Sequence, residues 1–312
     1  MITKKGISIG KKDIESIISY YNIGCLESYS IMPMGENINI QIKTTKGNYH
    51  IKLFIQENSE KKHFLLFELL LTDYLSNKGI KVPGIIKTSS GKLYTKHKNR
   101  FCVIYEFIDG KATYPLTRDT ISQVGEFLGQ FHKATMGFSC KYRTTRGRFT
   151  PRTLLHDLIH DYLPHYRNAD IRAKITQESK FIYNMKYSKL PIGAIHMDID
   201  PQNFIFKNNK LQALIDFGDA LQGLLIIDVA RGAYEFCLGS GLNFDFELLK
   251  IFIQHYQKYR PLTKAEKNAF SDFLRFTFIW KITDGVRAKK SNSWILKRLN
   301  MMKKVPDKFP FI

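Results

Sequence analysis

The chain has 312 residues, 44% of them hydrophobic and 24% charged, with 48 Lys and Arg against 28 Asp and Glu. This length is more than one hydrophobic core usually serves, so we expect two lobes, and the composition excludes a mainly disordered chain. No apolar run approaches the roughly 18 residues of a membrane-spanning helix, so we expect no membrane partner. The net charge of +20 allows nucleic-acid binding. However, the most basic stretches, 141–152 and 287–308, do not interleave aromatic residues as strand-binding platforms do, which disfavours that partner.

The cysteines and the first residues favour a reducing compartment. Cys25, Cys102, Cys140 and Cys237 are scattered without C-x-x-C spacing, which is typical of free thiols and leaves a disulfide as the poorer alternative. The opening MITKKGISIGKK is basic, but no apolar segment follows it, so it does not resemble a signal peptide. We therefore expect a cytoplasmic protein.

Strand patterns dominate the first third of the chain. Apolar spacing predicts helices over 11–21 and 61–77, and β-rich runs bounded by turns predict strands over 26–34, 37–44, 49–54 and 100–107, with a hairpin over 85–98. Successive residues of a strand point to opposite faces, so Lys52 should face away from Ile51 and Leu53. These strands predict an antiparallel sheet.

Helical patterns dominate the remainder. Apolar spacing predicts helices over 119–135, 154–169, 173–185, 246–259 and 265–282. The exception is 193–220, where three short β-rich runs, 194–195, 204–206 and 213–215, alternate with polar loops.

This exceptional stretch carries the chemistry. His196, Asp198 and Asn203 follow the first run, and Asp216-Phe217-Gly218 follows the third. A phosphoryl transfer needs a base to orient the attacking hydroxyl and oxygen ligands to hold Mg²⁺ between phosphates, and this spacing supplies both. A surface hairpin with ordinary polar turns is the alternative, but two matched halves at strand ends disfavour it.

The pattern H-x-D-x-x-x-x-N followed by I-D-F-G-D-A resembles the aminoglycoside phosphotransferase/choline kinase superfamily rather than the protein kinases. The similarity extends over about residues 20–290. It implies an α+β, protein-kinase-like fold with two lobes. Residues 1–108 would form a nucleotide-binding lobe with a five-stranded antiparallel sheet, and 109–312 a larger helical lobe for catalysis and substrate binding.

The resemblance also implies roles for individual residues. Asp198 would accept or orient the proton of the acceptor hydroxyl, and Asn203 and Asp216 would hold Mg²⁺. Lys52 would contact the nonreacting phosphates of ATP, and Glu68 on the following helix would pair with that lysine.

The resemblance implies four further positions that contact the nucleotide. It also implies two residues with structural roles. Gly35 and Asn37 lie in a turn that would cover the phosphates with its backbone N–H groups. Glu106 and Ile108 lie in E-F-I-D-G, similar to the segment whose backbone meets adenine. The resemblance gives Asp228 the task of accepting N–H bonds from the catalytic loop and His132 a structural one.

Within the superfamily the chain is most similar to type II homoserine kinases. The shared segments are YNIGCL from Tyr21, ENIN from Glu36, TTKGNY from Thr44, and Y-x-x-x-R-P-L-T-x-x-E from Tyr256 to Glu266; the chain departs from that family at Asp216–Asp219. The resemblance implies transfer of the γ-phosphate of ATP to homoserine, in threonine biosynthesis. Two alternatives stay open: an aminoglycoside- or choline-type phosphotransferase, and a non-catalytic nucleotide-binding or basic interaction protein.

The charge of the chain distinguishes between homoserine and an aminoglycoside as the acceptor. The expected substrate-pocket insert, 141–189, has eleven Lys and Arg against four acidic residues. Such a field repels a polycationic aminoglycoside but is indifferent to a zwitterion. This favours a small zwitterionic amino alcohol as the acceptor.

Overall fold

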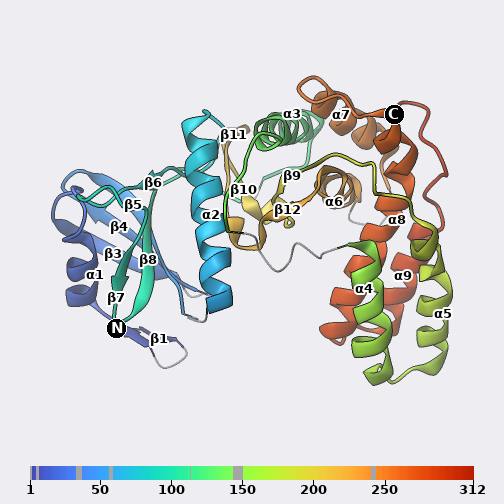
Figure 1. Ribbon diagram of the computed structural model, residues 1–312, viewed down its shortest axis with the longest axis horizontal. Coiled ribbons are helices and arrows are strands. Elements are labelled where there is room, and N and C mark those ends of the chain that lie inside the picture. Colours follow the sequence, from blue (N-terminus) through green and yellow to red (C-terminus); the bar gives the residue numbers. More distant parts are fainter. Residues whose placement is uncertain are drawn as a thin grey trace.

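A computed structural model describes residues 2–4, 7–32, 37–55, 59–112, 114–142, 150–239 and 244–312. An antiparallel sheet with two helices occupies the N-terminal part, and helices dominate after residue 118 (Figure 1). This is the expected two-lobed α+β architecture. None of the helices in the described ranges is long and apolar enough to cross a membrane.

The N-terminal sheet has six strands rather than the five expected. Its order is β3-β4-β5-β8-β6, and β7 also pairs with β8. The strands are β3 (Leu26–Met32), β4 (Ile38–Thr44), β5 (Gly47–Leu53), β6 (Ile85–Ile86), β7 (Thr95–His97) and β8 (Arg100–Glu106). The segment 85–98 does not form the predicted hairpin, because β6 pairs with the end of β8 and β7 with its beginning.

The two faces of this sheet bury different helices. Helix α1 (Lys11–Ile18) packs on one face with Ile51 and Leu53, and α2 (Ser59–Asn77) packs on the other with Val103 and Tyr105 (Figure 1). Strand β5 therefore alternates as predicted, and Lys52 points toward the α2 side. A short hairpin, β1 (Ile2–Lys4) with β2 (Ile7–Ile9), precedes α1 and was not predicted.

The second lobe is built on one large apolar core that also includes Leu71 and Leu75 of α2. Its helices are α3 (Arg118–Thr135), α4 (Pro151–Asp157), α5 (Ala169–Ser179), α6 (Leu225–Cys237), α7 (Phe246–Gln257), α8 (Lys264–Arg287) and α9 (Asn292–Met302). Its short strands are β9 (Ile192–Ile195), β10 (Phe204–Lys207), β11 (Lys210–Leu214) and β12 (Leu221–Leu224), in the pairs β10–β11 and β9–β12.

One predicted helix in this lobe is interrupted in the structure, and another helix was not predicted. Within the helix expected over 154–169, the α-helical part ends at Asp157, and a π-turn and a 3₁₀-turn follow it. A regular helix does not continue because Pro164 cannot donate the hydrogen bond that this requires. Asn168 then starts α5 by accepting from the Ile171 N–H at 3.0 Å. Helix α9 was missed, although Ile295, Leu299 and Met302 lie at helical spacing on its buried side.

All four cysteines are free thiols, and Cys102 and Cys237 are buried. This confirms the prediction from their scattered spacing.

Candidate active site

A buried lysine meets two carboxylates where the sheet faces α2. Lys52 Nζ lies 2.8 Å from Oε1 of Glu68 and 3.2 Å from Oδ1 of Asp216. The hydroxyl of Tyr105 donates to the same Glu68 oxygen at 3.3 Å. The predicted Lys52–Glu68 pair is therefore confirmed, and the fold adds Asp216 from 164 residues away.

The charges in this group stabilise one another. Burial alone would lower the pKa of Lys52, but Glu68 and Asp216 outweigh it and hold that pKa above its ordinary value. Lys52 in turn lowers the pKa of Asp216, against the opposing effect of burial. The site thus presents an ammonium beside an ionised carboxylate, a pair that suits phosphate oxygens and a metal cation.

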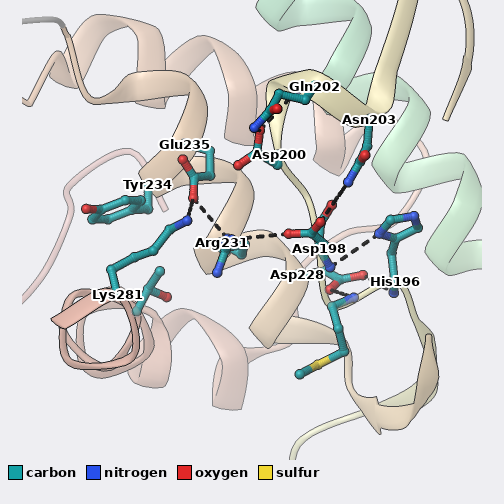
Figure 2. A network of polar contacts seen from close by, with 12 residues as sticks. His196, Asp198, Asp200, Gln202, Asn203, Asp228, Arg231, Tyr234, Glu235 and Lys281 are labelled. Atoms are coloured by element: carbon teal, nitrogen blue, oxygen red, sulfur yellow. Dashed lines mark hydrogen bonds and ion pairs between the residues drawn. The ribbon is translucent and has the colours of Figure 1, made fainter. Parts of the chain in front are cut away.

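Asp198 is held from two sides in the loop that follows β9. Asn203 Nδ2 donates to its carbonyl oxygen and to its Oδ2, both at 2.9 Å. Arg231 Nη2 donates to Oδ1 at 3.3 Å, yet 41% of the Asp198 side chain stays exposed (Figure 2). The carboxylate is fixed in orientation and still accessible, as a group that orients an acceptor hydroxyl must be.

Backbone contacts join this loop to the segment that carries Asp216. The Ile215 N–H donates to the Asn203 carbonyl at 2.8 Å, and the Ile215 carbonyl lies 3.0 Å from His196 Nε2. The His196 ring also packs edge-on against Phe217, with centroids 4.7 Å apart. His196 therefore organises the two segments.

Asn203 and Asp216 have the donors that a divalent cation bound to phosphates requires. Asn203 uses its amide nitrogen toward Asp198, which leaves its side-chain oxygen for a metal. Asp216 has φ +62°, a sparsely populated backbone conformation, and its side chain is 61% exposed. Because Mg²⁺ usually takes one or two protein oxygens plus substrate phosphates, these residues fit such an ion.

Asp228 on α6 fixes the backbone of the catalytic loop. Its fully buried carboxylate accepts the His196 N–H at 2.7 Å and the Met197 N–H at 2.9 Å. Met197 has φ +70°, an unfavourable conformation for a residue with a side chain. Asp228 therefore acts as the predicted organiser and stabilises the strained turn before Asp198.

A directed chain of hydrogen bonds that ends in an ion pair, called the buried relay below, continues from Asp228 into the core. It comprises Asp228, His132, Tyr256, Arg260 and Glu266. His132 Nε2 lies 3.4 Å from Asp228 Oδ2, and its Nδ1 lies 2.9 Å from the Tyr256 hydroxyl, which accepts from Arg260 Nη1 at 2.9 Å. Arg260 also pairs with Glu266 at 2.8 Å.

The ends of the relay fix its direction. An arginine only donates and an ionised carboxylate only accepts, so Tyr256 donates to Nδ1 of His132, and Nε2 carries the proton of a neutral imidazole. Burial lowers the pKa of His132, which favours the same neutral form. His132 is thus structural, as predicted.

Two glycines allow α3 and α7 to approach closely enough for this relay. A Cβ on Gly125 would lie 2.5 Å from the Phe252 carbonyl oxygen, and one on Gly129 would lie 2.4 Å from that of Tyr256. Both distances are shorter than real Cβ contacts, so any side chain here would push the helices apart. The glycines therefore set the helix spacing that brings His132 to Tyr256.

The passage from the sheet to the helical lobe begins at Glu106. Its N–H donates to the Gly84 carbonyl at 2.8 Å, and its Oε2 accepts the Gly84 N–H at 3.2 Å. Ile108 follows half-buried, and Lys111 then exchanges backbone hydrogen bonds of 2.8 and 2.9 Å with Phe206 of β10. Glu106 and Ile108 thus lie where the two lobes join, and their contact with adenine stays a prediction.

The turn between β3 and β4 is described only in part. Gly35 lies outside the described residues. Asn37 Oδ1 accepts the Ile55 N–H at 3.3 Å, which joins the start of β4 to the end of β5. The phosphate-covering role of this turn stays a prediction.

Sequence reasoning missed three charged residues beside Asp198, called the ionic cluster below: Arg231, Glu235 and Lys281. Arg231 and Glu235 are one turn apart on α6, and Lys281 comes from α8. The i, i+4 spacing of Arg231 and Glu235 was the only signal available in the sequence.

The fold and the site define a phosphotransferase that acts on a hydroxyl group. The chain belongs to the phosphotransferase enzyme family, whose model matches residues 35–262. It is 26% identical to a homoserine kinase of Xanthobacter autotrophicus, over 86% of this chain and 82% of that protein. It is 28% identical to a homoserine kinase of Rhizobium meliloti, over 84% of this chain and 79% of that protein.

Solved structures share the fold at lower identity. The amicoumacin kinase hAmiN, in complex with AMP-PNP, Ca²⁺ and Ami, matches with a TM-score of 0.71 and 18% identity over 94% of this chain and 93% of that one. A microcompartment-associated aminopropanol kinase matches with a TM-score of 0.69 and 15% identity over 94% of both chains. The choline kinase LicA of Streptococcus pneumoniae matches with a TM-score of 0.56 and 18% identity over 94% of this chain and 97% of that one.

Proposed function

We propose that the protein is an ATP-dependent homoserine kinase that acts in threonine biosynthesis. The observation that carries the proposal is the alignment of two homoserine kinases along 84–86% of the chain. The structural neighbours named for other acceptors are 15–18% identical and support the fold alone. The free thiols agree with a cytoplasmic location.

ATP binds between a nucleotide-binding lobe, residues 1–108, and a catalytic lobe, residues 109–312. The complex of hAmiN, which shares the fold, with AMP-PNP supports nucleotide binding. Lys52, held by Glu68 at 2.8 Å, contacts the phosphates that do not react.

The remaining nucleotide contacts come from backbone groups. The turn with Gly35 and Asn37 covers the phosphates, and the backbone around Glu106 and Ile108 meets adenine. The attachment of Asn37 to Ile55 after β5 and of Glu106 to Gly84 supports these assignments, since both segments are anchored to the sheet, one at each end of β5.

Asp198 orients the acceptor hydroxyl toward the γ-phosphate and accepts its proton. A carboxylate serves for this because the transition state is loose and needs little proton transfer beforehand. Asn203 and Asp216 hold Mg²⁺, which when bound neutralises charge on the phosphates. The anchoring of Asp198 by Asn203 and Arg231 supports this orienting role.

Steady-state assays coupled to ADP release test the acceptor. We expect a higher kcat/KM for homoserine than for choline or kanamycin. A kanamycin or choline value above that of homoserine would overturn the acceptor assignment and leave the phosphotransferase class intact.

A further inference from the structure

The ionic cluster lies on the acceptor side of Asp198. His196 and Asn203 join Asp198 to Ile215, next to the predicted metal ligand Asp216, whereas Arg231 contacts the opposite side of the loop (Figure 2). An acceptor whose hydroxyl reaches Asp198 opposite the phosphates therefore places its other groups near the cluster.

The cluster retains unused binding capacity. Arg231 Nε lies 3.1 Å from Glu235 Oε1, and Lys281 pairs with the same oxygen, so two cations share one carboxylate oxygen. Glu235 keeps its second oxygen, and the Lys281 ammonium has three donors.

The cluster is also open to solvent and divided by charge. The side chains of Glu235 and Lys281 are 14% and 20% exposed. Asp200, two residues after Asp198, lies beside Glu235 (Figure 2). The pKa of Glu235 is raised, mainly by burial and to a smaller extent by the charge of Asp200. Two carboxylates thus adjoin each other on one side, and Lys281 offers an ammonium on the other.

We propose that the ionic cluster is the subsite for the charged groups of a zwitterionic acceptor. The acceptor ammonium binds Glu235 with Asp200, and the acceptor carboxylate binds Lys281. This inference rests on the proposed function, because it takes Asp198 as the group that receives the acceptor hydroxyl. It specifies an amino acid with a side-chain hydroxyl as the substrate class.

Three acceptors separate the two charges. Homoserine carries both; 3-amino-1-propanol is the same chain without the carboxylate, and 4-hydroxybutanoate is the same chain without the ammonium. Each is assayed with the wild type, Lys281→Met and Glu235→Gln. Lys281→Arg tests rescue by retained charge, and Lys267→Met, exposed at the far end of α8, is the matched control.

For each variant the kcat/KM of homoserine is divided by that of the one-charge acceptor, so that general damage cancels. Lys281→Met should lower the ratio of homoserine to 3-amino-1-propanol by about 10- to 100-fold, the effect of one charged hydrogen bond. Glu235→Gln should lower the ratio of homoserine to 4-hydroxybutanoate similarly. Lys281→Arg should restore most of the first ratio, and Lys267→Met should change neither.

Unchanged ratios in both variants, with homoserine still phosphorylated by the wild type, would overturn the subsite and leave the proposed function standing. Phosphorylation of none of the three acceptors by the wild type would contradict both the proposed function and the subsite.

Discussion

Two polar networks contact the catalytic loop from α6, one through Asp228 and one through Arg231, and they differ in access to solvent. In the buried relay, His132 and Asp228 are fully buried, and the side chains of Arg260 and Glu266 are 6% and 0% exposed. In the ionic cluster, Arg231 is also buried, with 5% of its side chain exposed, but Glu235 and Lys281 reach the surface beside the 41% exposed Asp198. The same residue types therefore occur in a sealed network and in an open one.

The difference indicates a division of labour. A sealed, directed chain of hydrogen bonds can fix the strained backbone at Met197, because its members have no competing partner. An open cluster with spare donors and acceptors can exchange partners when a charged molecule arrives. We infer that the relay determines where the loop lies and the cluster determines what the loop acts on.

The largest effect on turnover is expected at Asp198, which lies next to both networks. Asp198→Ala should lower kcat by about 10²- to 10⁴-fold, the usual contribution of a positioned acid–base group. ATP affinity from isothermal titration should stay near the wild-type value, because Asp198 faces the acceptor. Turnover within about tenfold of wild type would exclude the proposed role.

Changes to the predicted metal ligands should affect ATP binding rather than the acceptor or the position of the loop. Asp216→Ala or Asn203→Ala should weaken the Mg²⁺ dependence of ATP binding by at least about tenfold, because each removes an oxygen ligand. Titrations of ATP with and without Mg²⁺ measure this dependence. Equal ATP affinities with and without Mg²⁺ in the wild type would count against a metal-bridged site.

Tyr256→Phe breaks the relay while keeping its volume. The change leaves His132 Nδ1 without its donor and removes one acceptor from Arg260, so the free energy of unfolding should fall by about 2 kcal/mol. Urea unfolding measures it, with Glu235→Gln as the comparison from the open cluster. A loss for Glu235→Gln as large as that for Tyr256→Phe would remove the distinction between the networks.

Acid offers a smaller perturbation of the relay. The pKa of His132 is held below its ordinary value of 6.5, chiefly by burial, so the unfolded chain binds the proton more readily than the folded one. The stability from neutral His132 is complete above pH 6.5 and is lost as pH falls toward its folded pKa. Burial, and to a smaller extent the charge of Lys52, lowers the pKa of His50 to about 4. His50 therefore also makes the fold less stable as pH falls.

His132→Gln separates the two histidines, because the amide can donate to Asp228 and accept from Tyr256 without titrating. Between pH 7.5 and 5.5 the variant should lose about 1 kcal/mol less unfolding free energy than the wild type. Unfolding curves at both pH values measure the difference. Identical losses in the two proteins would show that His132 does not titrate in this range.

Local spacing made part of the site predictable from sequence. The period of two in β5 placed Lys52 opposite Ile51, and the loop pattern placed Asp198 and Asn203 together. Lys52 and Glu68 were paired by resemblance, and the structure confirms the contact at 2.8 Å.

The ionic cluster was not predictable in the same way. Arg231 reaches Asp198 across 33 residues, and Lys281 joins because α8 packs against α6. Such contacts depend on helix packing, which apolar spacing alone does not specify. The break after α4 was missed for a local reason, since Pro164 interrupts a pattern whose apolar spacing continues.

Identification of the product tests the central claim most directly. The purified wild type is incubated with ATP, Mg²⁺ and homoserine, and the reaction is followed by ³¹P NMR. The account predicts a phosphomonoester of the homoserine hydroxyl in the same amount as ADP, and its absence in Asp198→Ala. Formation of ADP with inorganic phosphate alone, or equal ester formation in Asp198→Ala, would contradict it.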